Sequence, residues 1–204
     1  MSALPSHLEL VQGVVLPKPV GADPVLDFVN TRSDWITVRG PARTEWLTSY
    51  EAFLIWNSYV GLLPPATVFR LIEQASGKPT EAARRLRTAL EFRADLYDVL
   101  TGPETDGSFE AAARVMEKAS GRRQLVPTGK GASWELPEDL AQPLDQVALL
   151  AAELLTGPSR PHVRVCPGES CGWLFLDQRG RRRWCSMATC GNRAKVRAHA
   201  ARTR

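Results

Sequence analysis

All four cysteines of the chain lie between positions 166 and 190, and their spacing is the strongest chemical signal in the sequence. They form two pairs, Cys166 with Cys171 and Cys185 with Cys190, and each pair has four residues between its members. Two cysteine pairs joined by a short loop are typical of a structural zinc site, where four thiolates surround the ion at about 2.3 Å. Such a shell leaves no open position for catalysis. We therefore predict one structural Zn²⁺ bound by these four side chains.

Three other uses of the cysteines stay open on spacing alone. Two disulfides are typical of a secreted chain, whereas we expect this one in a reducing compartment. An iron–sulfur cluster also takes four cysteines, but the close C-x2-C runs usual for such clusters do not occur here. A catalytic cysteine would need a partner base, and the sequence indicates no Cys–His pair. His162 and His199 flank the cluster, and we predict that neither is a ligand because four thiolates already close the shell.

The residues around the cysteines predict a small treble-clef-like module. A tight turn is expected at Cys166-Pro167-Gly168, a strand over 173–176, a return through Arg183 and Trp184, and a helix from about Cys190. About forty residues bury too little apolar surface to fold alone, so the metal would stabilise the module. Cys190 would stand at the start of the helix, where the helix dipole favours a thiolate.

Basic residues are concentrated at the end of the chain. No acidic residue follows Asp177, and the first 177 residues hold 17 cations against 22 acids. We call residues 178–204 the cationic segment; its nine cations are Arg179, Arg181, Arg182, Arg183, Arg193, Lys195, Arg197, Arg202 and Arg204. A solvated basic end is one interpretation of such a run. Beside a zinc site, an anionic partner such as DNA is the other.

The rest of the chain is predicted to be mainly helical with small β elements, an α+β fold. Hydrophobic periodicity and capping residues predict helices over 49–59, 65–75, 80–100, 108–118 and 137–155, and a β-hairpin over 123–136. Thr80 and Ser108 are the expected N-caps of two of these helices. The run Val25–Asn30 favours a short strand, and residues 1–22 an extended segment. A joint at Gly157–Pro161 divides the chain into domains 1–157 and 162–204.

Several classes of protein are disfavoured by the sequence. No apolar run approaches the roughly 20 residues of a membrane span, and the N-terminus does not have the pattern of a signal peptide, so we expect a cytoplasmic protein. No phosphate-binding loop, nucleophile motif or acid–base pair is recognisable, and the three histidines are peripheral. We therefore expect a protein that is not an enzyme.

Two stretches closely resemble the CGNR zinc finger, a family named after the run Cys190-Gly191-Asn192-Arg193. These stretches are residues 166–177 and 182–195; the loop between them, with Arg179 and Arg181, departs mildly from the pattern. The preceding part resembles the ABATE domain, through Leu26–Thr31 and Ala151–Leu155. The resemblance implies a bacterial, stress-related transcription regulator with a zinc-binding C-terminus.

The leading interpretation is a regulator that binds DNA through the cationic segment, with the N-terminal domain sensing a small molecule. Arg193 and Arg197 are expected to contact phosphates, and Arg181–Arg183 to approach base edges. Asp27 and Asn30 are the candidate polar residues of an effector pocket; a strand-end turn is their alternative role. The alternative function is a zinc-stapled module that binds a protein or a ligand without contacting DNA.

Overall fold

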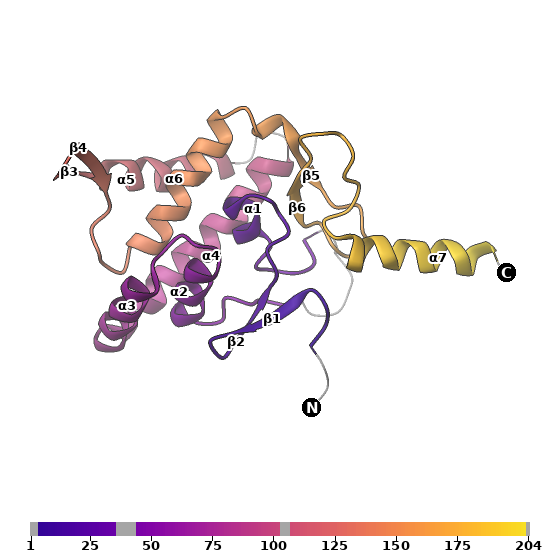
Figure 1. The fold of residues 1–204 in the computed structure, drawn as a ribbon, viewed down its shortest axis with the longest axis horizontal. Coiled ribbons are helices and arrows are strands. Elements are labelled where there is room, and N and C mark those ends of the chain that lie inside the picture. The colour runs from indigo at the N-terminus through magenta and orange to yellow at the C-terminus, as the bar shows by residue number, and fades with distance from the viewer. Residues whose placement is uncertain (1–3, 36–43, 103–106, 203–204) are drawn as a thin grey trace. The chain divides into compact units, whose positions relative to one another are not determined.

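The computed structural model describes residues 4–35, 44–102 and 107–202. The chain is mainly helical with small two-stranded antiparallel sheets, which confirms the predicted fold class (Figure 1). It forms two compact units: unit 1 comprises residues 1–47 and 158–204, and unit 2 comprises residues 48–157. None of the helices in the described ranges combines the length and the apolar character that crossing a bilayer requires.

Unit 2 is a bundle of five helices with one hairpin among its described residues. Its elements are α2 (Tyr50–Tyr59), α3 (Pro65–Gly77), α4 (Pro79–Thr101), α5 (Ser108–Gly121), β3 (Gln124–Thr128), β4 (Gly131–Glu135) and α6 (Gln142–Thr156). Helix α5 packs against α4 and α6, and α2 packs against α3, α4 and α6. Strands β3 and β4 form the predicted hairpin. The helices therefore share one core, to which Phe53, Trp56, Phe92 and Leu96 contribute fully buried side chains.

Three helix starts in unit 2 differ from the prediction. Helix α5 includes Ser108 as its first residue, and Gly107, with a positive φ of 72°, is its N-cap, so Ser108 is not the cap. Helix α4 begins at Pro79, which has no backbone N–H to satisfy, so Thr80 is not its N-cap. Helix α6 begins at Gln142 rather than near residue 137, because the Asp139 side chain accepts a hydrogen bond from Ala141 N (2.9 Å) in a turn before it. Helix α2 begins as predicted, with Ser49 accepting from Ala52 N.

Unit 1 is built from both ends of the chain. Its elements are β1 (Leu8–Val11), β2 (Val14–Pro17), α1 (Pro24–Val29), the 3₁₀ turn η1 (Arg160–His162), β5 (Val163–Val165), β6 (Leu174–Leu176), the π-helical turn η2 (Met187–Gly191) and α7 (Asn192–Arg202). The β1–β2 hairpin was not predicted. Its two-residue turn, Gln12-Gly13, has positive φ at both positions (48° and 83°), which glycine tolerates and which matches the twist of a hairpin.

The predicted strand at Val25–Asn30 is wrong, because this run forms helix α1. Asp23 caps the helix by accepting a hydrogen bond from Val25 N (2.8 Å), and Pro24 occupies its first turn. All side chains from Val25 to Val29 are buried. A short apolar run that is buried all round has no periodicity that separates a strand from a helix.

Strand β6 has a bonding partner on each edge. On one edge it pairs antiparallel with β5. On the other, Asn30 Nδ2 donates to Leu174 O (2.9 Å) and Asn30 Oδ1 accepts from Leu174 N (2.8 Å). Leu176 N also donates to Gly21 O (2.9 Å). Gly21 and Asn30 of the N-terminal segment thus satisfy backbone groups on the second edge of β6. The division into domains 1–157 and 162–204 itself stays a prediction.

Candidate metal centre and cationic surface

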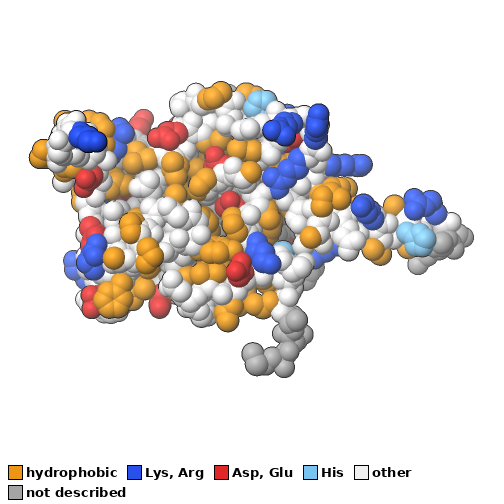
Figure 2. All heavy atoms as spheres, viewed as in Figure 1, with side chains coloured by type: hydrophobic (Ala, Val, Ile, Leu, Met, Phe, Trp, Pro, Cys, Tyr) orange, Lys and Arg blue, Asp and Glu red, His pale blue; other side chains and the backbone are white. Residues whose placement is uncertain are grey.

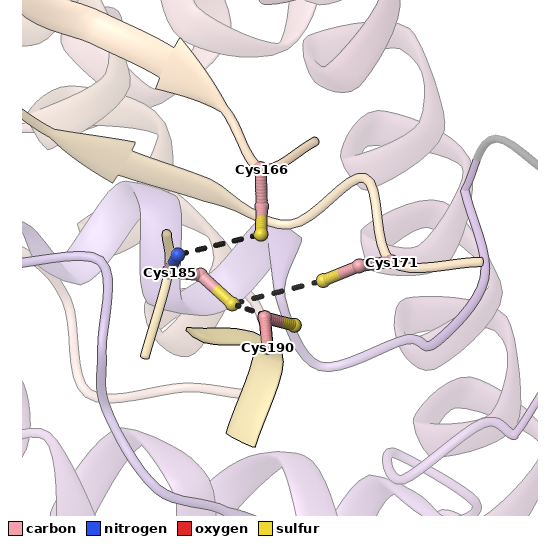
Figure 3. Close-up of side chains that lie close together, drawn as sticks. All are labelled: Cys166, Cys171, Cys185 and Cys190. Carbon is pink, nitrogen blue, oxygen red and sulfur yellow. Dashed lines mark hydrogen bonds between the residues drawn. The ribbon is translucent and has the colours of Figure 1, made fainter. Parts of the chain in front are cut away.

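Three short segments of unit 1 bring the four cysteines together. Cys166 directly follows β5, and its N–H donates to Trp173 O (2.8 Å), which continues the β5–β6 pairing by one residue. Cys171 closes the turn after it by donating from N to Gly168 O (3.0 Å). Cys185 precedes η2, and Cys190 lies in η2 directly before α7. Figure 3 shows all four sulfur atoms pointing toward one another.

The sulfur geometry fits one tetrahedral zinc ion. All four Sγ atoms lie within 4.8 Å of one another. The Cys171–Cys185 and Cys185–Cys190 sulfur atoms are 3.7 and 3.6 Å apart, close to the edge of about 3.8 Å for a tetrahedron with Zn–S bonds of 2.3 Å. These separations are also far too long for S–S bonds of about 2.05 Å, so the two-disulfide alternative is wrong. Neither His162 nor His199 belongs to this group of ligands.

The electrostatics of the cluster call for a cation. Hydrogen bonds from the neighbouring thiols lower the pKa of Cys166. The same contacts with Cys166 raise the pKa of Cys171 and of Cys185. The pKa of Cys190 is also lowered, so two of the four adjacent sulfur atoms favour the thiolate and two favour the thiol. A divalent cation removes this difference because it stabilises the thiolate at every ligand. Cys185 N also donates to Cys166 Sγ (3.4 Å), which supports that sulfur as a thiolate.

Two glycines allow the chain to close around the sulfur atoms. A Cβ at Gly168 would lie 2.9 Å from Cys190 Sγ and 3.3 Å from Cys171 Cβ. At Gly191 it would lie 2.8 Å from the sulfur of Met187 and 3.2 Å from the Trp184 ring. All four distances are shorter than ordinary van der Waals contact. Neither glycine was predicted as a site residue, although the Cys-Pro-Gly turn was.

Asp27 and Asn30 are both engaged inside unit 1. Asp27 Oδ1 accepts from Val20 N and Gly21 N, each at 2.7 Å, and Asn30 binds β6 as described above. Burial raises the pKa of Asp27 to about 6, against the lowering effect of the two hydrogen bonds. Asp23 raises the pKa further, whereas Arg182 lowers it. The structure therefore gives these two residues a positioning role for the segment that holds β6.

Arg182 points inward and joins the metal centre to the N-terminal segment. Its guanidinium donates to the carbonyl oxygens of Val20, Trp184 and Cys185 and lies 4.6 Å from the centroid of the Phe175 ring. We predicted Arg182 as a DNA contact from the charge run alone. The hydrogen bonds to the three carbonyl groups make Arg182 part of the structure that supports the cysteine cluster, and its contact with DNA stays a prediction.

The other predicted DNA contacts lie on two exposed surfaces of unit 1. Arg179, Arg181 and Arg183 are exposed on the loop after β6, which we call the arginine loop (residues 178–184). The described cations of α7 are Arg193, Lys195, Arg197 and Arg202, and Arg204 lies outside the described residues. Figure 2 shows Lys and Arg side chains gathered beside β5 and β6 and along α7. Arg197 also forms an ion pair with Glu169.

Helix α7 has no buried residue, and Val196 is 60% exposed. Figure 1 shows α7 extending away from β5 and β6 toward the C-terminus, and within its unit it packs against η2. Isolated helices of this length are marginal in water. A partner that binds this polar, cationic helix could therefore stabilise its helical conformation.

Comparison with known families matches both parts of the chain. A model described as CGNR zinc finger matches residues 162–203. A model of the ABATE family, described as a putative stress-induced transcription regulator, matches residues 22–158. A search of curated proteins found no match. The zinc-finger match and the close packing of four cysteines agree on one structural zinc ion.

Proposed function

Because the chain belongs to the ABATE family and ends in a CGNR zinc finger, we propose that it is a transcription regulator that binds DNA through unit 1. One observation carries the proposal: a segment with nine cations and no acid also provides Cys185 and Cys190, two of the four cysteines that can hold a metal ion. We propose that the protein acts by binding rather than by catalysis. A four-thiolate site suits a reducing compartment, and we place its action in the cytoplasm.

Phosphate contact is the interaction that these cations favour. Arginine and lysine on exposed elements neutralise phosphates and release the counterions condensed on the duplex. The zinc ion would fix the arginine loop relative to the start of α7, since Cys185 follows the loop and Cys190 precedes the helix. Two cationic elements held in one orientation could contact phosphates on both sides of a groove.

We predict that Lys195→Ala/Arg202→Ala flattens the salt dependence of duplex binding. Both side chains are exposed on α7, and neither is paired with an acid among the described residues. Each phosphate that the variant no longer neutralises should lower the slope of log K against log salt by about 0.9, so the two substitutions together should lower it by up to about 1.8. Binding to different sequences should weaken equally. Electrophoretic or anisotropy measurements at several salt concentrations give the slope.

Glu169→Gln is the matched control for this experiment. It removes the acid that pairs with Arg197 and should steepen the slope, since that guanidinium becomes free to contact a phosphate. The proposal fails if the double variant, with its zinc retained, binds duplex as tightly as the wild type at every salt concentration. A protein-binding role for the finger would then take its place.

We further propose that unit 2 senses a small molecule. A cavity of about 310 Å³ lies between α4 and α5 and reaches the start of α6. Its wall carries three cations and three acids, which are Arg85, Arg114, Lys118, Glu91, Asp95 and Asp145. Its size suits a metabolite, and the two signs of charge favour one that carries both an ammonium and a carboxylate or phosphate group.

A thermal-shift screen with amphoteric metabolites tests this part of the proposal. A ligand at a hundredfold excess over its Kd should stabilise the folded state by about 2.7 kcal/mol, which raises the melting temperature by several degrees. Arg114→Ala should abolish the shift of a ligand that binds in this cavity, because Arg114 lines it and is exposed. A shift that survives Arg114→Ala and Lys118→Ala places the ligand elsewhere.

A further inference from the structure

A cleft of about 910 Å³ lies beside the arginine loop in unit 1. Residues of the loop and the residues that follow it to Met187 line the cleft, together with Val20 and Ala22. The cleft is about as large as the upper range of small-molecule sites, and far larger than one phosphate ion requires. It is a concave site, distinct from the convex exposed surface of α7.

The charge of this cleft is strongly positive. Arg179, Arg181 and Arg183 line it, and no ion pair joins any of them to an acid among the described residues. Its one acid in the described lining, Asp177, is already engaged, because Asp177 Oδ1 accepts from Arg181 N (2.9 Å) and Arg182 N (3.1 Å). The cleft therefore presents free guanidinium groups, which bind phosphate oxygens in a bidentate manner.

An aromatic surface lies next to these arginines. The half-buried Trp184 ring lines the cleft, and the guanidinium of Arg183 lies 5.2 Å from its centroid. Met187, which is 57% exposed, adds a polarisable side chain beside it. Rings and guanidinium planes are the surfaces on which unpaired nucleobases stack.

We propose that this cleft binds an unpaired nucleotide, with the phosphate on Arg179 and Arg181 and the base against the Arg183–Trp184 pair. Phosphate-binding arginines and a stacking surface meet in one concavity, and a nucleotide is the chemical class that carries both matching groups. The paired bases of a duplex are stacked on one another and cannot reach Trp184. The nucleotide is free in solution or belongs to a single strand. This inference does not rest on duplex binding by α7.

Three probes distinguish the sources: thymidine monophosphate, a thymidine single strand of about 12 nucleotides, and a duplex of the same length. The zinc-loaded full chain is used throughout. Trp184→Leu should weaken binding of the single strand by roughly 5- to 150-fold, the range measured for stacked bases, and should leave the salt slope unchanged. Arg179→Ala/Arg181→Ala should instead lower the single-strand slope by up to about 1.4.

A direct signal from Trp184 keeps the test independent of folding effects in the leucine variant. The chain has six tryptophans, and labelling with 5-fluorotryptophan gives each its own ¹⁹F resonance. Trp184→Phe identifies the Trp184 signal by its absence, and it keeps an aromatic ring beside Gly191. Addition of the nucleotide or of the single strand should shift that signal. Lys195→Ala/Arg202→Ala should leave the shift intact, because neither residue lines the cleft.

Each outcome has one meaning. A shift with thymidine monophosphate supports a free nucleotide, and a shift with the strand alone supports single-stranded nucleic acid. The inference is overturned if duplex alone binds, or if the Trp184 signal does not move with either unpaired probe. Binding of the strand without binding of duplex would keep this inference and refute the proposed function of α7.

Discussion

Removing the zinc ion should release both ends of the chain and leave residues 48–157 folded. The metal holds three segments of unit 1 together, and zinc binding supplies roughly 10–16 kcal/mol of folding free energy in small modules of this kind. The core of unit 2 is formed by its own helices and includes none of the four cysteines. Loss of the metal should therefore unfold unit 1 and spare unit 2.

The N-terminal segment should unfold together with the finger. Asn30 and Gly21 bond to β6, and Arg182 holds the carbonyl groups of Val20 and Cys185. Trp173 also donates from Nε1 to Arg32 O (2.8 Å) and lies edge-on to Trp46. Without the finger, these backbone groups and buried side chains lose their partners, at about 1–3 kcal/mol for each unsatisfied group.

Limited proteolysis with mass spectrometry, with and without a chelator, measures this result. We expect a resistant fragment of residues 48–157 after chelation, and the same fragment from Cys185→Ser in the presence of zinc. A resistant fragment of residues 1–157, cut at Gly157–Pro161, would instead favour the domain boundary predicted from sequence. A single transition that unfolds the whole chain would contradict both boundaries.

The helices were predictable because their information is local. The helices α2 to α5 and the β3–β4 hairpin carry periodic apolar positions and turn residues close to their ends. Helix α1 was not predictable in this way, because it packs against β6, which lies about 145 residues further along the chain. A short buried apolar run is compatible with a strand and with a helix, so its composition does not separate the two. Only the Asp23-Pro24 start favours the helix.

The metal ligands were predictable for the same reason, since spacing and residue type define a four-thiolate site. The roles of the arginines were not. Arg181, Arg182 and Arg183 are alike in a charge pattern, yet Arg182 is drawn inward by three carbonyl groups. Asp27 and Asn30 were chosen as polar residues in an apolar run, and their partners are backbone groups that no local pattern reveals.

Asp27 is a buried carboxyl of unit 1 whose ionisation should affect the stability of that unit. Its Oδ1 atom accepts both hydrogen bonds, from Val20 N and Gly21 N, so an amide oxygen at the same position can accept them as well. Burial raises its pKa from 3.8 to about 6, which means that the folded state holds the proton more tightly than the unfolded state. The charged form therefore destabilises the fold.

The sign of the pH effect follows from these two pKa values. Below about pH 3.8 the carboxyl is protonated in both states, and its ionisation has no effect on stability. Between about pH 3.8 and 6 the unfolded state loses its proton first, so the free energy of unfolding falls as the pH rises. Above pH 6 the full loss is present and amounts to about 3 kcal/mol.

The change in unfolding free energy that Asp27→Asn causes should therefore be more favourable at neutral pH than at acidic pH. The variant removes the ionisation and keeps the acceptor atom, and the attraction of the carboxylate to Arg182 is already included in the pKa of about 6. We expect the difference in unfolding free energy between variant and wild type to rise by about half of the 3 kcal/mol between pH 5 and pH 8. Urea unfolding of both proteins with excess zinc measures it, and comparison at each pH cancels the proton dependence of metal binding. A difference that stays flat over this range would show that Asp27 is ionised with an ordinary pKa in the folded state.

Asn30→Asp, which introduces a carboxylate where Leu174 O needs a donor, should instead destabilise the protein increasingly as the pH rises.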